Sequence, residues 1–139
     1  MNAENYVTLE FPSRSANEGF ARAAAACFAA QLDPTLEEVN DIKTAVSEAV
    51  TNAIVHAYPD RIGRVVMKLR RRENQVLEIV VRDWGVGIAD VEQARTPLFT
   101  TGMGFTIMES FMDSLKVRSA PGKGTTVTMR RQIARRVSG

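Results

Sequence analysis

The sequence predicts an α+β fold, a two-layer α/β sandwich in which a mixed sheet carries helices on one of its faces. Two observations predict it. Segments that alternate apolar and polar residues, as strands do, stand between segments whose apolar residues recur every three or four positions, as in helices. These segments follow one another irregularly instead of in strict β-α-β order. The 139 residues have the length of a single domain, expected as a core of residues 6–131 with a short basic tail, 132–139.

The first two elements are a strand over residues 6–11 and a helix over roughly 16–31, which Ser13 or Ser15 can cap. The only cysteine, Cys27, lies in that helix and is expected to be a small buried residue. A lone cysteine excludes a disulfide within the chain. The residues that stand at helical spacing in this segment are Phe20, Ala24, Cys27, Phe28 and Gln31.

A second helix is predicted to begin at Asp33, as N-cap, and Pro34, and to end near Ala57–Tyr58, before Pro59. Its core face is defined by apolar residues in steps of three and four. The remaining elements are strands over 64–71 and 76–82 joined by a turn at 73–75, a short helix near 90–94, a helix over 104–112, and strands over 115–119 and 125–131.

The charge is modest, with a formal net charge of +2 and a pI near 9.0. This imbalance is too small to indicate nucleic acid by itself, and the arginine clusters at 70–72 and 130–136 lack interleaved aromatic residues. No apolar run approaches about 18 residues, and the polar N-terminus does not resemble a signal peptide. We therefore expect a cytoplasmic protein without membrane or direct nucleic-acid contacts.

Three polar residues of the second helix, Glu48, Asn52 and His56, recur at intervals of four. Four residues advance a helix by slightly more than one turn, so the three side chains share one stripe beside the core face. Small residues flank the stripe and would let a ligand approach. From this helix alone, a solvated edge and a binding site are about equally supported.

Three glycine-containing segments follow: DWGVGI at 83–88, TTGMGF at 100–105 and GKGTTV at 122–127. Glycines allow tight turns and close approach of a flat group, a carboxylate at a strand end can accept hydrogen bonds from an amine, and a free helix N-terminus can hold phosphate oxygens. Each segment alone is equally typical of an ordinary turn or helix start.

Together, the order ExxxNxxxH, DxGxG, GMGF and GTT resembles the N, G1, G2 and G3 boxes of the GHKL superfamily of ATPases and kinases, which implies its Bergerat-type ATP-binding fold. Within that superfamily, SEAVTNAIVHAY, LFTT, GMGFTIMESFMD and NEGFARAAAACFAAQLDPT are similar to the sporulation anti-sigma factors, which are serine kinases of their own antagonist. The similarity spans nearly all of residues 6–131.

The resemblance implies a role for each matching residue. Glu48 would be the general base that accepts the proton of the attacking serine, Asn52 would coordinate Mg²⁺, and Asp83 would bind the adenine amino group of ATP or ADP. His56 would contact the phosphates or merely neighbour Tyr58. Gly85 and Gly87 would make room for the base, and either Thr125 or Thr126 would lie near Asp83 and help to hold the adenine. The residues that would supply backbone donors to the phosphates are Gly102, Met103, Gly104 and Phe105, and Thr101 is also assigned to the nucleotide.

The resemblance also implies partners. A homodimer would bind one sigma factor and release it to a dephosphorylated anti-anti-sigma factor, whose serine is the kinase substrate. Arg22 matches a position of the first helix that contacts protein partners; without that match, an ordinary solvated arginine would be the better interpretation.

One departure from the pattern bears on activity. Relatives carry a longer ATP lid with a basic residue between LFTT and GMGF, whereas Thr101 is followed directly by Gly102 here. Either the lid is deleted or the sequence omits a mobile segment, and mobile lids at such sites favour omission. The alternatives are a sigma-binding module that holds nucleotide without transferring phosphate, a stress-response anti-sigma kinase, or another GHKL domain such as that of a histidine kinase.

Overall fold

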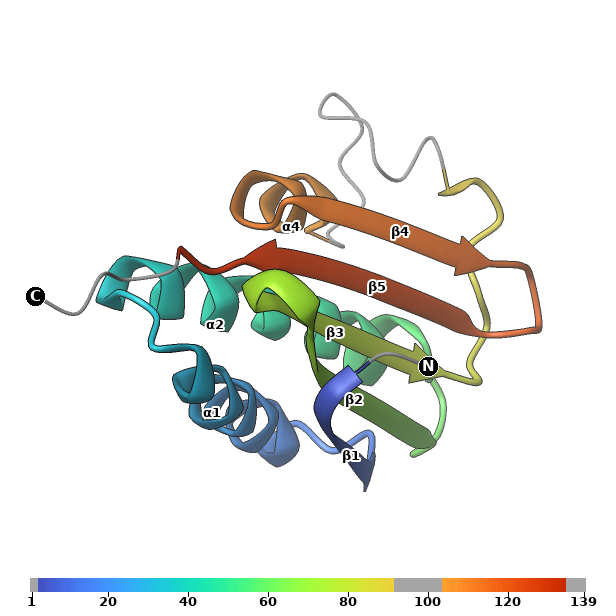
Figure 1. The fold of residues 1–139 in the computed structure, drawn as a ribbon. Coiled ribbons are helices and arrows are strands. Elements are labelled where there is room, and N and C mark those ends of the chain that lie inside the picture. The colour runs from blue at the N-terminus through green and yellow to red at the C-terminus, as the bar shows by residue number, and fades with distance from the viewer. Residues whose placement is uncertain (1–2, 92–103, 135–139) are drawn as a thin grey trace, which may run out of the picture.

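The protein folds as a five-stranded antiparallel sheet with helices packed on one face (Figure 1). The structure is a computed structural model and describes residues 3–91 and 104–134. The strand order is β1-β2-β3-β5-β4. The α+β class and the placement of the helices are therefore confirmed. The strands are β1 (Ala3–Pro12), β2 (Arg64–Arg72), β3 (Val76–Asp83), β4 (Ser114–Ser119) and β5 (Thr125–Gln132).

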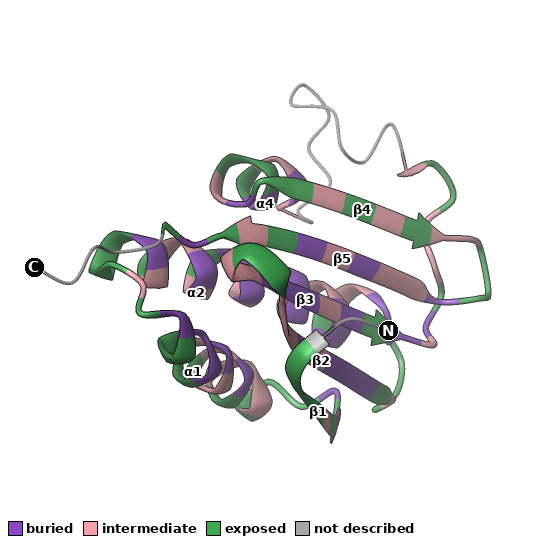
Figure 2. Cartoon of the chain, viewed as in Figure 1, coloured by how far each residue is buried: buried purple, intermediate pink, exposed green. Residues whose placement is uncertain are grey.

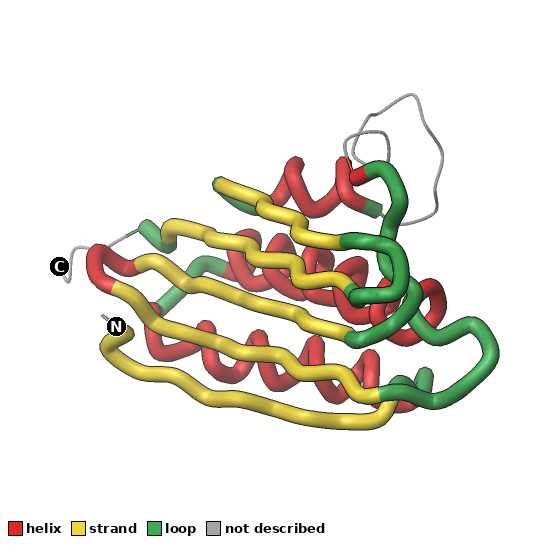
Figure 3. Tube along the Cα trace, turned by 90° about the vertical axis from the view of Figure 1, so that its right-hand side faces the viewer, coloured by secondary structure: helices red, strands yellow, loops and turns green. Residues whose placement is uncertain are grey.

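Three α-helices are described: α1 (Ala16–Ala29), α2 (Leu36–Thr51) and α4 (Phe105–Phe111). All three helices lie on the same side of the sheet, behind the strands in the view of Figure 3. α2 is central, since it packs against both α1 and α4. Short 3-10 segments are η1 (Ala30–Leu32) and η3 (Glu73–Gln75), the latter at the predicted turn between β2 and β3. The helix predicted near 90–94 falls mostly outside the described residues.

The expectation of a mixed sheet is wrong, because all four strand pairings are antiparallel. Tight turns join β2 to β3 and β4 to β5, and a tight turn can connect only antiparallel neighbours. The last strand then inserts between β3 and β4, running against both. The irregular order of helices and strands had suggested a mixture that the pairing does not contain.

The first helix is rotated relative to the prediction. Phe20 is 58% exposed and Cys27 is exposed, so neither belongs to the core. Three of the four buried residues of α1 are alanines, which allow α1 to approach α2 closely. Ser15 occupies the N-cap position, as predicted, but its side chain makes no capping hydrogen bond, and the hydroxyl of Ser13 accepts a hydrogen bond from Gly63 N at 2.8 Å. The buried residues are Ala21, Ala25, Phe28 and Ala29.

The second helix begins two residues later than predicted. Thr35 is its N-cap, and Thr35 and Glu38 form a reciprocal capping box with distances of 3.1 and 2.8 Å. Asp33 instead ends η1 in the left-handed region, with φ of 52°. An aspartate tolerates that conformation better than most residues, so a helix end competes with the helix start predicted there.

The far end of the second helix widens into a π-helical segment, η2 (Asn52–His56). Its closing hydrogen bond runs from Ala57 N to Asn52 O at 3.0 Å, five residues apart. Such π turns are rare and occur frequently at functional sites. The helical segment still ends close to Ala57–Tyr58, as predicted.

Alternation along the strands separates two environments. Odd-numbered strand residues such as Met67, Ile79 and Met129 are completely buried beneath the helices. Even-numbered residues face away from the helices, where exposed and half-buried positions predominate (Figure 2). We call this second surface the open face. Among the described residues, no helix is long and apolar enough to cross a membrane.

One acidic side chain on the open face is buried. The side chain of Glu78 is 3% exposed and receives Arg130 Nε at 2.7 Å, Arg70 Nη1 at 3.0 Å and Arg72 Nη1 at 3.4 Å. Burial by itself raises the pKa of Glu78, but the hydrogen bonds from Arg130 and Arg70 outweigh it and hold the pKa below its usual 4.5. This cluster ties β2, β3 and β5 together.

We predict that Glu78→Gln lowers the free energy of unfolding at pH 7 by about 2 kcal/mol, because three guanidinium groups lose their common carboxylate. A carboxyl group with a lowered folded-state pKa stabilises above its unfolded pKa, and the contribution is lost as pH falls through the lower value. Denaturant unfolding from pH 7 to pH 3 should therefore show a shallower acid dependence in Glu78→Gln than in the parent. The control is Glu10→Gln, whose exposed pair with Arg64 should contribute below about 0.5 kcal/mol. Equal losses in the two variants would contradict the role given to Glu78.

Candidate functional site

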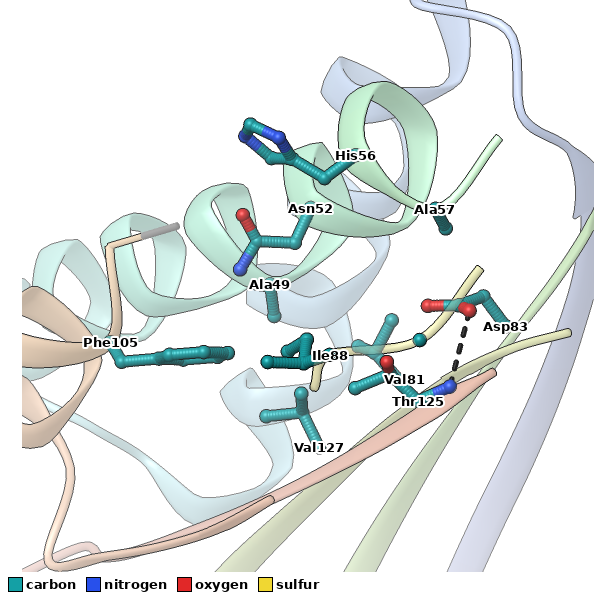
Figure 4. Close-up of a pocket in the computed structure, with 11 residues that line it drawn as sticks. Ala49, Asn52, His56, Ala57, Val81, Asp83, Ile88, Phe105, Thr125 and Val127 are labelled. Atoms are coloured by element: carbon teal, nitrogen blue, oxygen red, sulfur yellow. Dashed lines mark hydrogen bonds between the residues drawn. The ribbon is translucent and has the colours of Figure 1, made fainter. Parts of the chain in front are cut away.

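A pocket lies at one end of the molecule, between the end of α2 with η2 and the adjoining ends of β3 and β5 (Figure 4). It is a narrow hollow with a cavity volume of about 20 Å³, and it opens to solvent. Its wall is largely apolar with a few polar groups. The lining residues are Ala49, Asn52, His56, Ala57, Val81, Asp83, Gly87, Ile88, Phe105, Thr125 and Val127.

Asp83 is the carboxylate of this pocket and is 6% exposed at the end of β3. Its Oδ1 atom accepts hydrogen bonds from Gly85 N at 2.9 Å and Thr125 N at 3.2 Å. The other carboxylate oxygen points toward the pocket (Figure 4). Burial raises the pKa of Asp83, and these two backbone hydrogen bonds oppose the rise. The two backbone hydrogen bonds to Oδ1 thus fix the orientation of the Asp83 carboxylate, and its other oxygen can accept a hydrogen bond from a ligand.

Of the two threonines predicted beside Asp83, Thr125 is the one in the pocket. Thr125 pairs with Asp83 across β3 and β5, and its hydroxyl lies 2.7 Å from that of Ser119. Thr126 lies on the open face, in register with Arg82 and Arg118. Successive strand residues point to opposite faces, so only one of the two could reach the site.

The first glycine after Asp83 is required by packing. A Cβ atom on Gly85 would collide with the carbonyl oxygen of Ala57, the residue that follows η2. The same oxygen accepts a hydrogen bond from Val86 N at 2.9 Å. Gly85 is absent from the pocket lining and acts by letting the helix end rest on the loop after β3. This differs from the predicted role, which was to make room for a base.

Tyr58, whose part in the site was not predicted, reinforces this contact. Its buried hydroxyl accepts a hydrogen bond from Trp84 N at 2.7 Å and donates one to Arg64 O at 2.6 Å. It therefore links the end of the second helical segment to the residue after Asp83 and to the start of β2. No sequence pattern in this chain indicates that a tyrosine hydroxyl should fall there.

Gly87, the second glycine, does line the pocket. It has φ of +77°, and a Cβ atom there would collide with the carbonyl oxygen of Ala120. The next residue, Ile88, donates its backbone N–H to Ser119 Oγ at 2.7 Å. Ser119 thus links Ile88 and Thr125, two residues that line the pocket. No sequence pattern in this chain predicted that contact.

The helical wall contributes Asn52 and His56, which both line the pocket. The Oδ1 atom of Asn52 is buried. A π turn accommodates more residues than an α turn, so four residues no longer overshoot a full turn as the predicted stripe assumed.

Phe105, at the start of α4, is buried and contributes its ring to the lining (Figure 4). The resemblance had implied only a backbone contact for this residue.

Glu48 does not line this pocket. It borders a neighbouring groove between α1 and α2, together with Arg22, Asn40, Lys43, Thr44 and Ser47. Arg22 is held there by Glu18 at 3.2 Å and Ser47 Oγ at 3.3 Å. Gly104 lies against Glu48, because a Cβ atom on it would collide with the Glu48 carboxylate. Gly104 also has φ of +67°, which glycine adopts readily.

Three predicted nucleotide contacts, Thr101, Gly102 and Met103, lie outside the described residues, as does the junction where a lid would be inserted. Within the described part, an apolar slot is closed at one end by an oriented carboxylate and bordered by an amide. Such a slot suits a flat heterocycle that donates a hydrogen bond.

The chain matches the family described as "Histidine kinase-like ATPase domain" over residues 11–131. It is 54% identical to the anti-sigma F factor of Caldanaerobacter subterraneus over 142 aligned positions, covering 97% of this chain and 99% of that protein. It is 52% identical to the anti-sigma F factor of Geobacillus kaustophilus, covering 94% of each chain. For the anti-sigma F factor of Pasteuria penetrans the identity is 55%, covering 93% and 91%.

Two solved structures support the fold. The RsbU and RsbW domains of Rv1364c from Mycobacterium tuberculosis match with a TM-score of 0.70 at 20% identity, covering 97% of this chain and 34% of that one. The blue-light activated histidine kinase EL346 of Erythrobacter litoralis matches with a TM-score of 0.62 at 23% identity, covering 85% and 41%.

We predict that Asp83→Asn leaves the protein as stable as the parent at pH 7, or makes it more stable. The asparagine oxygen can still accept both backbone hydrogen bonds, and the cost of burying a charge disappears. A carboxyl group with a raised folded-state pKa favours folding at low pH and loses this advantage as pH rises through that pKa. Thermal unfolding from pH 4 to pH 8 should therefore favour Asp83→Asn increasingly toward high pH.

The control for this prediction is Asp60→Asn, at an exposed position, which should follow the parent across the same range. A large loss of stability in Asp83→Asn at pH 7 would mean that the charged form of Asp83 holds the fold together.

Proposed function

Because the chain belongs to the histidine kinase-like ATPase family and, within it, to the anti-sigma F factors, we propose that it inhibits a sporulation sigma factor in the cytoplasm and uses ATP as a serine kinase. Its substrate would be a serine of the anti-anti-sigma factor that releases the sigma factor. The observation that carries this proposal is the placement of Asp83 and Asn52 in one pocket, with Glu48 in the adjoining groove.

The chemistry of the pocket lining suits the base of ATP. The free oxygen of Asp83 can accept a hydrogen bond from the adenine amino group, while the backbone hydrogen bonds to its partner oxygen hold the carboxylate in place. Val81, Ile88 and Val127 provide apolar contacts for the ring. A base with a carbonyl in place of the amino group would bring an acceptor against a carboxylate. The site should therefore discriminate against guanine.

Asn52 would supply the metal contact, because its amide oxygen suits Mg²⁺, which usually keeps several waters and binds through few protein groups. Consistent with this, the described residues contain no cluster of three or more His, Cys, Asp or Glu side chains that could enclose an ion. Bound Mg²⁺ would neutralise phosphate charge. His56, which lines the pocket beside Asn52, remains a candidate contact to the phosphates.

The position of Glu48 supports a role as the base that acts on a protein substrate. It lies in a groove open to the surface between α1 and α2, next to Gly104 at the start of α4. A serine side chain entering that groove could give its proton to the Glu48 carboxylate as its oxygen attacks the γ-phosphorus and the bond to the β-phosphate oxygen breaks. The products would be phosphoserine and ADP.

The same groove supports Arg22 as a partner contact. Its guanidinium group is fixed by Glu18 and Ser47 while its side chain remains 42% exposed. An ordered, accessible arginine is a common anchor in protein interfaces. We further propose that the protein acts as a homodimer, as the resemblance implies.

A second candidate function is a sigma-binding module that holds ATP without transferring phosphate. It is favoured by one observation: the alignment with the Caldanaerobacter relative has 142 positions, more than the 139 residues of this chain, so the relative has residues without counterparts here. The direct junction of Thr101 and Gly102, in a region where the family carries its lid, could account for the difference.

We predict that ATP binds with micromolar affinity, that GTP binds at least about tenfold more weakly, and that Asp83→Asn weakens ATP binding at least about 100-fold by losing an acceptor of the amino group. Isothermal titration calorimetry in the presence of Mg²⁺ measures all three. Asp60→Asn serves as the control and should bind as the parent does. Equal affinities for ATP and GTP would contradict the role of Asp83.

For phosphoryl transfer, we predict that Glu48→Gln lowers the rate at least about 100-fold while the ATP dissociation constant changes less than about threefold, because Glu48 lies outside the base pocket. The assay follows phosphate from labelled ATP onto a purified anti-anti-sigma factor. Glu37→Gln, at the exposed start of the same helix, is the matched control. If the parent binds ATP and the antagonist but transfers no phosphate, the kinase proposal fails and the second candidate function stands.

A further inference from the structure

The open face of the sheet carries a concentration of positive charge that the composition does not reveal. Strand register places even-numbered residues of β2 to β5 side by side on this face. Four basic residues come from β2 alone: Arg64, Lys68, Arg70 and Arg72. Four more come from the other strands: Arg82 of β3, Lys116 and Arg118 of β4, and Arg130 of β5.

Acidic residues on the same face are few. Among the described strand residues of this face, Glu10 and Glu78 are the acidic ones, since Glu4, at the irregularity of β1, pairs with Arg71 on the helix side; Glu73 borders the face at the turn after β2. The face therefore has an excess of six positive charges, whereas the whole chain has a formal net charge of +2. All other residues together must be acidic by four charges. Positive charge is thus concentrated on the strand residues of the open face.

Internal pairing does not consume this charge. Glu78 is buried beneath Arg70, Arg72 and Arg130, and one carboxylate cannot neutralise three guanidinium groups. Lys68 and Lys116 lie in one row across the sheet, separated by Val80 and Thr128. No acidic residue stands in that row. A partner can therefore gain charge complementarity here without displacing an existing ion pair.

The dimensions of the surface suit an extended segment. Arg64 and Arg72 are eight residues apart on one strand, which corresponds to roughly 25 Å, and four adjacent strands span roughly 15 Å. At the end of the face formed by Arg72 and Arg130 there is a shallow hollow, also lined by Glu73 and Val76. At the other end, the guanidinium carbons of Arg64 and Arg82 lie 4.3 and 4.6 Å from the centre of the Trp84 ring.

A second copy packed face to face would bring two like-charged surfaces together, which disfavours that arrangement. Single-stranded nucleic acid would need exposed aromatic rings for base stacking. On the described part of this face the central strands β3 and β5 carry none, Tyr6 is a single exposed ring on the edge strand β1, and Trp84 is already covered by two guanidinium groups. The described residues of this face also form no projecting helix that could enter a duplex groove. An acidic polypeptide meets none of these objections.

We propose that the open face of the sheet is a docking surface for an acidic segment of a protein partner. The segment lies across β2, β3, β5 and β4, and its carboxylates pair with the row formed by Lys68 and Lys116 and with the arginines on either side. This surface is separate from the nucleotide pocket, because Asp83 and Thr125 face the opposite side of the sheet.

The test measures binding of a dye-labelled oligoglutamate peptide of about twelve residues by fluorescence anisotropy, at about 50 and about 300 mM salt. The full chain should bind the peptide, more weakly at the higher salt concentration. The double variant Lys68→Glu/Lys116→Glu should bind it at least about tenfold more weakly. The matched control Arg14→Glu/Lys123→Glu changes net charge equally at exposed positions outside the open face and should stay within about twofold of the parent.

Circular dichroism establishes that the variants fold, and Lys68→Gln/Lys116→Gln replaces the first variant if it does not. Equal weakening in the control, or no peptide binding by the parent, overturns the proposal. It is also overturned if an oligothymidylate of similar charge binds the parent more tightly than the peptide and loses binding in the Lys68/Lys116 variant. Self-association of the parent that this variant abolishes, measured by sedimentation, would assign the face to a second copy. ATP binding is measured in parallel and should be unchanged, so failure here is distinguishable from failure of the nucleotide site.

Discussion

The contact between the end of the second helix and the loop after β3 is the constraint on which the pocket depends. The carbonyl of Ala57 accepts a hydrogen bond from Val86, and the space beside it admits only hydrogen at Gly85. Tyr58 fastens the same junction through its two hydrogen bonds. Because the helix rests directly on the strand end, Asp83 and the helical residues Asn52 and His56 line one narrow pocket. A larger residue at Gly85 would move the two walls apart.

The polar residues Glu48, Asn52 and His56 of the second helix are divided between two neighbouring hollows. Beyond Thr51 the helix widens into the π segment, where Asn52 and His56 face the pocket. One turn earlier, Glu48 faces the groove shared with α1. Gly104, which precedes the pocket residue Phe105, lies in close contact with Glu48. A nucleotide and a protein side chain could therefore approach the same helix from different directions.

The sheet separates the molecule into two surfaces of different chemistry. Neighbouring residues such as Thr125 and Thr126 serve opposite faces, because a strand turns each successive side chain over. The helix side is apolar and contains the pocket. The open face carries most of the basic strand residues, and the buried carboxylate of Glu78 organises three of them. A net charge averaged over the chain conceals this separation, which appears only when strand register is known.

The sequence by itself determined the α+β class, the approximate position of every described strand, and the membership of Asn52, His56 and Asp83 in one site. These follow from local periodicity and from motifs whose order is written in the chain. Only the tertiary structure decided which face of α1 is buried, that the sheet is antiparallel throughout, and that Gly85 serves packing. These properties depend on which surfaces pack against each other, and that packing is formed by residues far apart in the sequence. The hydroxyl of Tyr58 is the clearest case, since its partners are a backbone amide and a carbonyl that no motif identifies.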